Sequence, residues 1–228
     1  MSFRRKIQYF LVQKLRISNR DAKEKLASGQ IQIDRMTVIE NVEIFPENEI
    51  TLNFEILKPA ESFTYLKYYK PAGIECTLNP DIADNLFALL PFPDVFPVGR
   101  LDKASEGLLL LTNDGRIYDK ILRKEQQVEK EYIVKTDKII SEDFIQKMQN
   151  GIQIMGKTTL PCVLEVIDKY TFKIILTQGL NRQIRRMCYK LDYEVLFLQR
   201  IRVGDIRLGD LTENQFEIIK NPMNPKTI

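Results

Sequence analysis

The segment from residue 98 to residue 115 contains the side chains best suited to chemistry. Arg100 and Asp102 place a cation and a carboxylate two positions apart, in a stretch that reads Gly-Arg-Leu-Asp. Four leucines follow at 108–111, a run typical of a buried strand. Reactive groups are often placed on a polar loop that is carried by a rigid strand. The pattern therefore predicts a functional loop, although Asp102 also fits a turn residue or a simple partner for Arg100.

A second carboxylate offers an alternative chemistry. Glu106 follows Asp102 by four positions, and two carboxylates can hydrolyse a glycosidic bond. The pair would make the protein a glycosidase. A glutamate at this place in a loop is more typical of a solvated turn, and we favour that interpretation.

The absence of histidine restricts the possible chemistry. None of the 228 residues is histidine, which excludes Ser-His and Cys-His catalytic pairs, histidine-bound zinc and the usual near-neutral base. Catalysis must rest on carboxylate, tyrosine, lysine or arginine. The three cysteines are far apart and lack Cys-x-x-Cys spacing, which is typical of free thiols in a reducing cytoplasm. We find neither an apolar run of spanning length nor a secretory leader.

Basic residues gather in two segments. Residues 4–25 hold eight lysines and arginines against two acids, and residues 181–207 hold seven against three. The net charge of the chain is only +3, so these clusters are local. Clustered like charges repel one another, and nucleic acid is the commonest partner that offsets this cost. Solvated basic surfaces would give the same pattern.

The first 57 residues have the pattern of a compact unit. Helical spacing predicts a helix over 3–15, and Ser18 with Asp21 predicts the start of a second helix that ends at Gly29. Alternating residues predict strands at 31–34, 37–42 and 48–54. The unit is therefore expected to pack two short basic helices against a small curled sheet.

Beyond a linker at 58–63, residues 64–228 are rich in strands. Strands are expected at 64–69, 108–112, 131–136, 162–167, 171–177 and 194–198, and helices at 82–90, 117–122, 141–151 and 182–190. The strands mostly follow one another without a regular βαβ order. This predicts an α+β fold, with a mixed, largely antiparallel sheet in the second domain.

Three motifs occur in order along the second domain. Tyr-Lys-Pro-Ala-Gly occupies 69–73, Gly-Arg-Leu-Asp-x4-Gly-Leu-Leu-Leu-Leu-Thr-Asn-Asp-Gly occupies 99–115, and Gln-Gly-Leu-Asn-Arg-Gln-Ile-Arg-Arg-Met-Cys occupies 178–188. Together they resemble the motifs of the RsuA-like pseudouridine synthases, in a form similar to the branch that includes the large-subunit rRNA synthase F. Residues 4–54 are similar to an S4 RNA-binding module. Tyr69 departs from the family, which often has asparagine there.

The resemblance implies a fold and a reaction. It implies an S4-like α/β RNA-binding domain at 1–57, followed by a pseudouridine synthase catalytic domain at 64–228 with a central cleft. Asp102 would act as the nucleophile, or as the base that starts cleavage of the N1–C1′ bond. Arg185 would keep this carboxylate ionised and aim it by bidentate contact. Tyr132 would stack on the detached uracil and relay the C5 proton.

The remaining site residues follow from the same resemblance. Ile184 would pack beneath the target nucleotide, Arg100 would fill the gap left in the RNA, and Arg182 would also bind substrate. In the first domain, Arg16, Arg20 and Lys23 would contact phosphates. Because the base must leave its stack, base flipping is expected.

The resemblance also implies the substrate and the setting. The expected substrate is 23S ribosomal RNA, and 16S rRNA or tRNA are the alternatives. A non-catalytic RNA-binding or ribosome-assembly factor with this fold is a further alternative. We expect no cofactor and no metal, no membrane association, and a cytoplasmic monomer.

Overall fold

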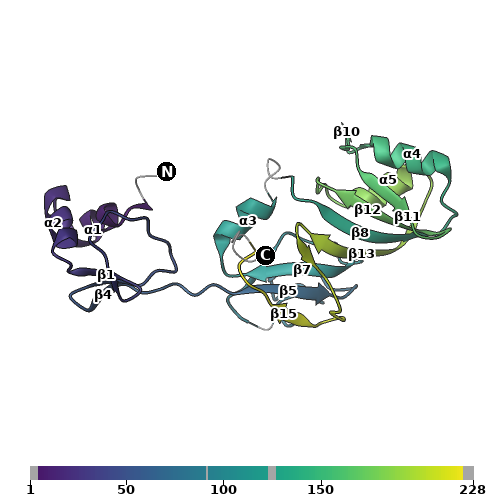
Figure 1. Cartoon of the computed structure of the whole chain (residues 1–228). Helices are drawn as coiled ribbons and strands as arrows, with labels where there is room; N and C mark the ends of the chain where they lie inside the picture. Colours follow the sequence, from purple (N-terminus) through teal and green to yellow (C-terminus); the bar gives the residue numbers. More distant parts are fainter. Residues whose placement is uncertain (1–4, 91, 123–126, 223–228) are drawn as a thin grey trace. The chain divides into compact units, whose positions relative to one another are not determined.

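The computed structural model describes residues 5–90, 92–122 and 127–222. Contacts within the chain divide it into two units, residues 1–63 and residues 64–228 (Figure 1).

The first unit packs two helices on a small sheet. Helices α1 (Ile7–Leu15) and α2 (Asn19–Ala27) precede a four-stranded sheet of order β2-β1-β3-β4. Its strands are β1 (Ile31–Ile33), β2 (Met36–Thr37), β3 (Ile50–Leu52) and β4 (Glu55–Lys58). The expected start of α2 is confirmed, because Ser18 and Asp21 form a reciprocal capping box. Residues 38–42 lie outside strands, although the pattern predicts a strand there, and β4 was not predicted.

The second unit is built on a nine-stranded sheet. The strand order is β11-β12-β8-β13-β7-β5-β15, with β14 paired to β13 and β6 paired to β7. The pairing of β13 with β7 is parallel, and the other pairings described in this sheet are antiparallel. The expected mixed, largely antiparallel sheet is therefore confirmed. The strands are β5 (Tyr65–Lys70), β6 (Phe96–Val98), β7 (Glu106–Thr112), β8 (Lys130–Thr136), β11 (Val163–Val166), β12 (Thr171–Leu176), β13 (Val195–Val203), β14 (Ile206–Arg207) and β15 (Phe216–Ile218).

Helices cover the two ends of this sheet. Figure 1 places α4 (Glu142–Asn150) and α5 (Gln183–Lys190) by β11, β12 and β8, and α3 (Gly115–Leu122) by β7. Short strands β9 (Gln153–Ile154) and β10 (Lys157–Thr158) form a separate hairpin. One core cluster joins the buried faces of α4 and α5 to β8, β12 and β13. The apolar side of α5 is thereby fixed on the sheet, which orients its polar side.

The helix expected at 82–90 is wrong. The segment forms turns instead, because asparagine side chains bond to nearby backbone amides. Asn79 Oδ1 accepts from Asp81 N at 3.0 Å, and Asn85 Oδ1 accepts from Phe87 N at 2.7 Å. Asp84 has a left-handed backbone (φ 52°), which an α-helix does not allow. These Asx turns compete successfully with the helical hydrogen-bond pattern.

Gly107 is required where β7 meets β13. Its φ is +99°, and an added Cβ would collide with the Arg200 carbonyl oxygen and lie 2.9 Å from Arg200 N. We expect Gly107→Ala to destabilise the second unit by about 3 kcal/mol or more. Gly156→Ala is the matched control, because Gly156 has φ +73° and no heavy atom near an added Cβ. Thermal unfolding should occur roughly 5 °C or more lower in Gly107→Ala than in Gly156→Ala. Equal unfolding temperatures would contradict this account.

Candidate active site

The Gly-Arg-Leu-Asp loop lies between β6 and β7. Asp102 is half-buried, and its backbone carbonyl accepts a hydrogen bond from Ser105 N at 2.9 Å. The leucines that follow form the buried part of β7. The predicted arrangement of a polar loop on a buried strand is confirmed.

A buried lysine braces one side of this loop. Lys70 is completely buried at the end of β5, and its ammonium donates to Pro71 O at 2.7 Å and Ile74 O at 2.8 Å. It also reaches Lys103 O at 3.5 Å. Burial lowers the pKa of Lys70 to about 8, while nearby acidic groups, including Asp102, oppose that shift. A cation therefore lies behind the Asp102 loop.

Arg185 braces the other side of the loop. Its Nη2 donates to Ala104 O at 2.8 Å and contacts Ser105 Oγ at 3.4 Å, while Nη1 donates to Val195 O at 3.0 Å. The guanidinium thus ties α5 to the Asp102 loop and to the start of β13. The carbonyls of residues 103 and 104, which follow Asp102 directly, are each held by a partly or fully buried cation.

The expected bidentate pair between Arg185 and Asp102 is not formed. Among the described residues, no salt bridge joins them, because the guanidinium fork is occupied by the backbone carbonyls of Ala104 and Val195. Their charges still interact. Burial lowers the pKa of Arg185, as does Arg182, whereas the Asp102 carboxylate raises it. Arg185 therefore acts on Asp102 through the loop and through the electric field.

Asp102 lines a cleft of about 640 Å³. Four other predicted site residues line the same cleft, namely Arg100, Tyr132, Arg182 and Ile184. The volume falls within the range of small-molecule sites. Arg185 is not among the lining residues and stands behind the loop.

These lining residues come from three separate parts of the unit, namely the loop before β7, strand β8 and the start of α5. Tyr132 is half-buried on β8, and Ile184 is 4% exposed in the first turn of α5. Arg100 is exposed and lies 3.6 Å from a Glu75 carboxylate oxygen. Arg182 is exposed at the N-cap of α5, where its backbone is left-handed (φ 51°). An aromatic ring, an aliphatic side chain and a carboxylate thus line one space.

One buried and one half-buried cation in the cleft were not predicted from the sequence. Arg200 on β13 is 4% exposed, and its Nε donates to Leu108 O at 2.7 Å, whereas its Nη2 has no partner among the described residues. Lys130 on β8 also lines the cleft, and burial followed by repulsion from Arg200 lowers its pKa. Neighbouring cations with a free donor favour an anionic ligand, such as a phosphate.

Glu106 does not belong to the cleft. The structure places it at the start of β7 and not on a turn, and it is absent from the described lining residues. Its carboxylate accepts a short hydrogen bond from Tyr69 Oη, which in turn accepts from Gln199 Nε2 at 2.8 Å. Burial and this hydrogen bond raise the pKa of Tyr69 to about 12. Tyr69, which stands where the family often has asparagine, therefore links β5 to β7 and β13 by hydrogen bonds. Because Glu106 does not line the cleft with Asp102, the carboxylate pair of a glycosidase is not formed.

The three basic residues singled out in the first unit are exposed. Arg16 follows α1 in a left-handed conformation (φ 55°), and Lys23 lies on α2. Arg20 forms an exposed pair with Glu24 at 3.1 Å. Such a pair contributes little to stability, so Arg20 remains available to another anion.

Comparisons with known proteins point to one family. Residues 64–190 match the family model described as RNA pseudouridylate synthase. The chain is 36% identical over 219 residues to the dual-specificity RNA pseudouridine synthase RluF of Escherichia coli (strain K12), covering 90% of this chain and 76% of that protein. It is 30% identical to the ribosomal large subunit pseudouridine synthase B of Bacillus subtilis (strain 168), covering 85% and 83% of the two chains. A crystal structure of a pseudouridylate synthase superposes with a TM-score of 0.66 at 26% identity, over 94% of this chain and 96% of that chain.

The described residues form neither a membrane-spanning helix nor a cluster of metal-binding side chains. No helix in this part of the chain is long and apolar enough to cross a membrane. The same residues contain no group of three or more cysteine, aspartate or glutamate side chains that could hold a metal ion.

Proposed function

The chain belongs to the RsuA-like family of RNA pseudouridine synthases, and on that premise we propose that it isomerises a uridine of 23S ribosomal RNA with Asp102 as the reacting carboxylate. The observation that carries the proposal is the braced Asp102 loop, which places the carboxylate in one cleft with Tyr132 and Ile184. A loop fixed by two cations loses little freedom when the substrate binds, which favours a well-aligned reaction.

The reaction balances within the nucleotide. The N1–C1′ bond breaks, the uracil rotates, and C5 forms the new bond to C1′ while its hydrogen is lost and N1 gains a proton. Asp102 either attacks C1′ or removes the proton that starts cleavage. In both cases the carboxylate must be ionised, and its charge interacts with those of Arg185 and Lys70.

The cleft residues hold the base once it has left its stack. We propose that Tyr132 stacks on the uracil and that Ile184 packs beneath the nucleotide. Arg100 is the residue proposed to fill the space left in the RNA, because its side chain is exposed at the edge of the cleft. Base flipping costs a few kcal/mol, so an unpaired or helix-end uridine is the favoured target.

The first unit is proposed to be an S4-like RNA-binding domain. We assign residues 1–57 to it, 58–63 to a linker, although Lys58 is the last residue of β4, and 64–228 to the catalytic domain. Arg16, Arg20 and Lys23 are the proposed phosphate contacts. We further propose that the protein works as a cytoplasmic monomer.

A second RNA is the main alternative target. The E. coli relative is named as dual-specificity, which favours considering 16S rRNA or tRNA beside 23S rRNA. A non-catalytic assembly factor is disfavoured, because such a factor would have no use for Asp102, Tyr132 and Ile184 around one cleft.

Mapping pseudouridine in cells that lack this gene tests the proposal. We expect one or a few uridines of 23S rRNA to lose the modification, and the wild-type gene to restore it. Loss confined to 16S rRNA or tRNA would reassign the target. An unchanged map of all these RNAs would refute the proposal, and free uracil released from RNA by the protein would indicate a glycosidase.

A further inference from the structure

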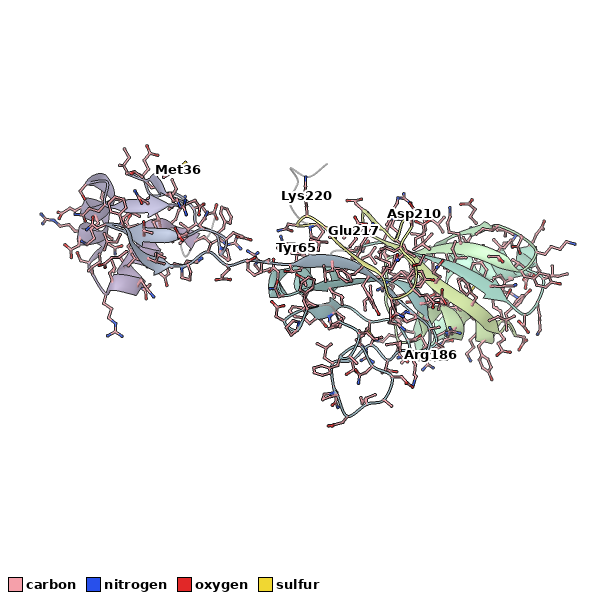
Figure 2. All side chains as sticks on the ribbon, turned by 90° about the horizontal axis from the view of Figure 1, so that it is seen from below. Met36, Tyr65, Arg186, Asp210, Glu217 and Lys220 are labelled. Atoms are coloured by element: carbon pink, nitrogen blue, oxygen red, sulfur yellow. The ribbon has the colours of Figure 1, made fainter. Side chains whose placement is uncertain are left out.

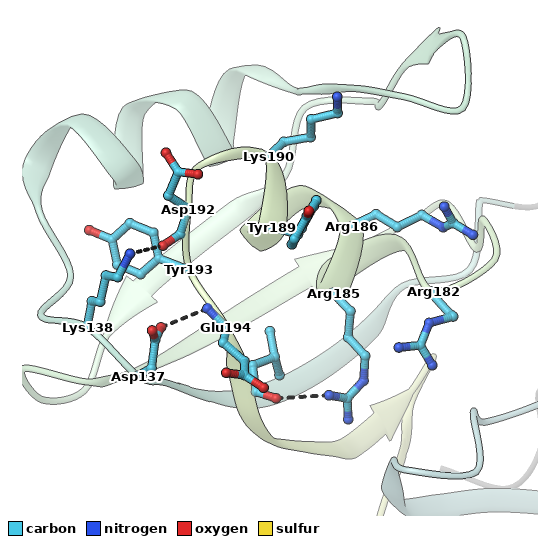
Figure 3. Close-up of a pocket in the computed structure, with 11 residues that line it drawn as sticks. Asp137, Lys138, Arg182, Arg185, Arg186, Tyr189, Lys190, Asp192, Tyr193 and Glu194 are labelled. Carbon is cyan, nitrogen blue, oxygen red and sulfur yellow. Dashed lines mark hydrogen bonds between the residues drawn. The ribbon is translucent and has the colours of Figure 1, made fainter.

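A second hollow lies beside α5, outside the catalytic cleft. Its volume is about 820 Å³, and Figure 3 shows its lining side chains on α5 and its N-cap, on the segment after α5, and on the two residues that follow β8. The lining residues are Asp137, Lys138, Arg182, Arg185, Arg186, Tyr189, Lys190, Asp192, Tyr193, Glu194 and Val195. We call this space the α5 pocket.

One stripe of α5 supplies the pocket with three arginines and an aromatic ring. Residues 182, 185, 186 and 189 follow the i, i+3, i+4, i+7 spacing that places side chains on one helix face. The other face, with Ile184, Met187 and Cys188, is buried in the core. This orientation leaves Arg182, Arg186 and Tyr189 exposed, whereas Arg185 is half-buried; Figure 2 labels Arg186.

Tyr189 is unusually exposed for an aromatic residue. Its relative exposure is 78%, and its hydroxyl has no hydrogen-bond partner among the described residues. Burial in the core therefore does not explain it. An exposed ring flanked by arginines is the arrangement by which proteins bind unpaired bases without reading their sequence.

The charges of the α5 pocket favour an anion. Five cationic side chains line it against three acidic ones. Asp137 is already engaged, because its Oδ1 accepts from Glu194 N at 2.7 Å. Arg186 is held in place by Asn181, to whose O and Oδ1 it donates at 3.0 and 3.1 Å. A fixed guanidinium loses less entropy when it binds phosphate.

The α5 pocket adjoins the catalytic cleft at Arg182. Arg182 lines both spaces, and Arg185 extends from the pocket side to the Asp102 loop. A helix rises about 1.5 Å per residue, so Arg182 and Tyr189 lie about 10 Å apart along α5. An RNA strand whose uridine enters the cleft can therefore continue over Arg182 into the pocket.

We propose that the α5 pocket binds an unpaired nucleotide that flanks the target uridine. Its base stacks on Tyr189, and its phosphates contact Arg182 and Arg186. This inference rests on the proposed function, since it takes the cleft as the uridine site. It adds a site for RNA beside the reacting nucleotide.

A tryptophan probe tests the location directly. The chain contains no tryptophan, so Tyr189→Trp introduces a single indole at the pocket. We expect a short single-stranded oligouridylate to quench its fluorescence on binding. Tyr170→Trp is the control, because Tyr170 is also exposed but lies on the turn between β11 and β12. Quenching in the control alone, or in neither protein, would overturn the proposal.

Affinity measurements separate stacking from charge. Two probes are compared, the oligouridylate and an abasic ribose-phosphate strand of the same length. Tyr189→Ala should weaken oligouridylate binding about 5- to 150-fold, while abasic-strand binding changes less than twofold. Tyr189→Phe should retain binding because the ring remains, and Tyr170→Ala should bind as wild type. Unchanged oligouridylate affinity in folded Tyr189→Ala would refute the site.

Failure here can be told apart from failure of the proposed function. Under single-turnover conditions with ribosomal RNA, the Tyr189→Ala loss should fall on the half-saturating RNA concentration. If Asp102 proves necessary for isomerisation while Tyr189→Ala binds RNA normally, only the α5 pocket inference fails. If Asp102 proves unnecessary, the proposed function fails whatever the fluorescence result.

Discussion

Replacement of Asp102 by asparagine is expected to lower the rate of pseudouridine formation by about 10⁴-fold or more. The amide has nearly the same shape but is a poor nucleophile and a poor base. The loop should keep its conformation, because Lys70 and Arg185 bond to the backbone carbonyls of residues 103 and 104. Neither of these hydrogen bonds involves the Asp102 side chain. RNA affinity and folding stability should therefore stay close to the wild type. The rate can be followed by tritium release from RNA labelled at C5 of uridine.

A second inactive variant and a control variant complete this test. Slow deamidation of asparagine would regenerate aspartate at position 102 and restore activity. Asp102→Ala cannot do this, and it should be as inactive as Asp102→Asn. Asp210→Asn removes an exposed carboxylate that lies apart from Arg186 in Figure 2, and it should retain the wild-type rate. More than a tenth of the wild-type rate in both Asp102 variants would mean that another group reacts.

Much of the scaffold follows from short-range patterns. The Ser18–Asp21 capping box and the Ser141 cap were predictable because a cap and its amide lie within one turn. Strand β7 was also predictable, because its four consecutive leucines at 108–111 are adjacent in the sequence and typical of a buried strand. In contrast, the expected helix over 82–90 was wrong, since its side-chain hydrogen bonds outcompeted helical spacing.

The candidate site was only partly predictable. Motifs located Asp102, Tyr132 and Ile184, and all three line one cleft. The partners of Arg185 could not be read from the sequence, because Ala104 O lies 81 positions away and backbone carbonyls have no residue signature. Arg200 was missed because an arginine in a strand gives no sign of burial before its neighbouring strands are known.

Loss of the Arg185 brace should give the second-largest effect on catalysis. Arg185→Met removes both carbonyl contacts and a positive charge near Asp102. Each hydrogen bond to a charged group contributes about 1.5–3 kcal/mol. If half of the sum for the two bonds, about 1.5–3 kcal/mol, is expressed in the transition state, the rate at saturating RNA should fall about 10- to 150-fold. Arg207→Met, on exposed Arg207 in β14, should have no such effect.

Arg185→Lys distinguishes positioning from charge alone. A single ammonium keeps the charge but cannot span Ala104 O and Val195 O, which the two guanidinium nitrogens reach at 2.8 and 3.0 Å. We expect an intermediate rate, roughly 4- to 12-fold below the wild type, because about one charge-assisted hydrogen bond is lost and half of its free energy is expressed in the transition state. The half-saturating RNA concentration should change much less, because both Nη atoms of Arg185 are already bonded to backbone carbonyls and the proposed phosphate contacts are Arg182 and Arg186. If the Arg185 variants lose RNA affinity but keep the wild-type rate at saturating RNA, Arg185 binds substrate. A wild-type rate and affinity in Arg185→Met would show that catalysis does not depend on its contacts to the loop.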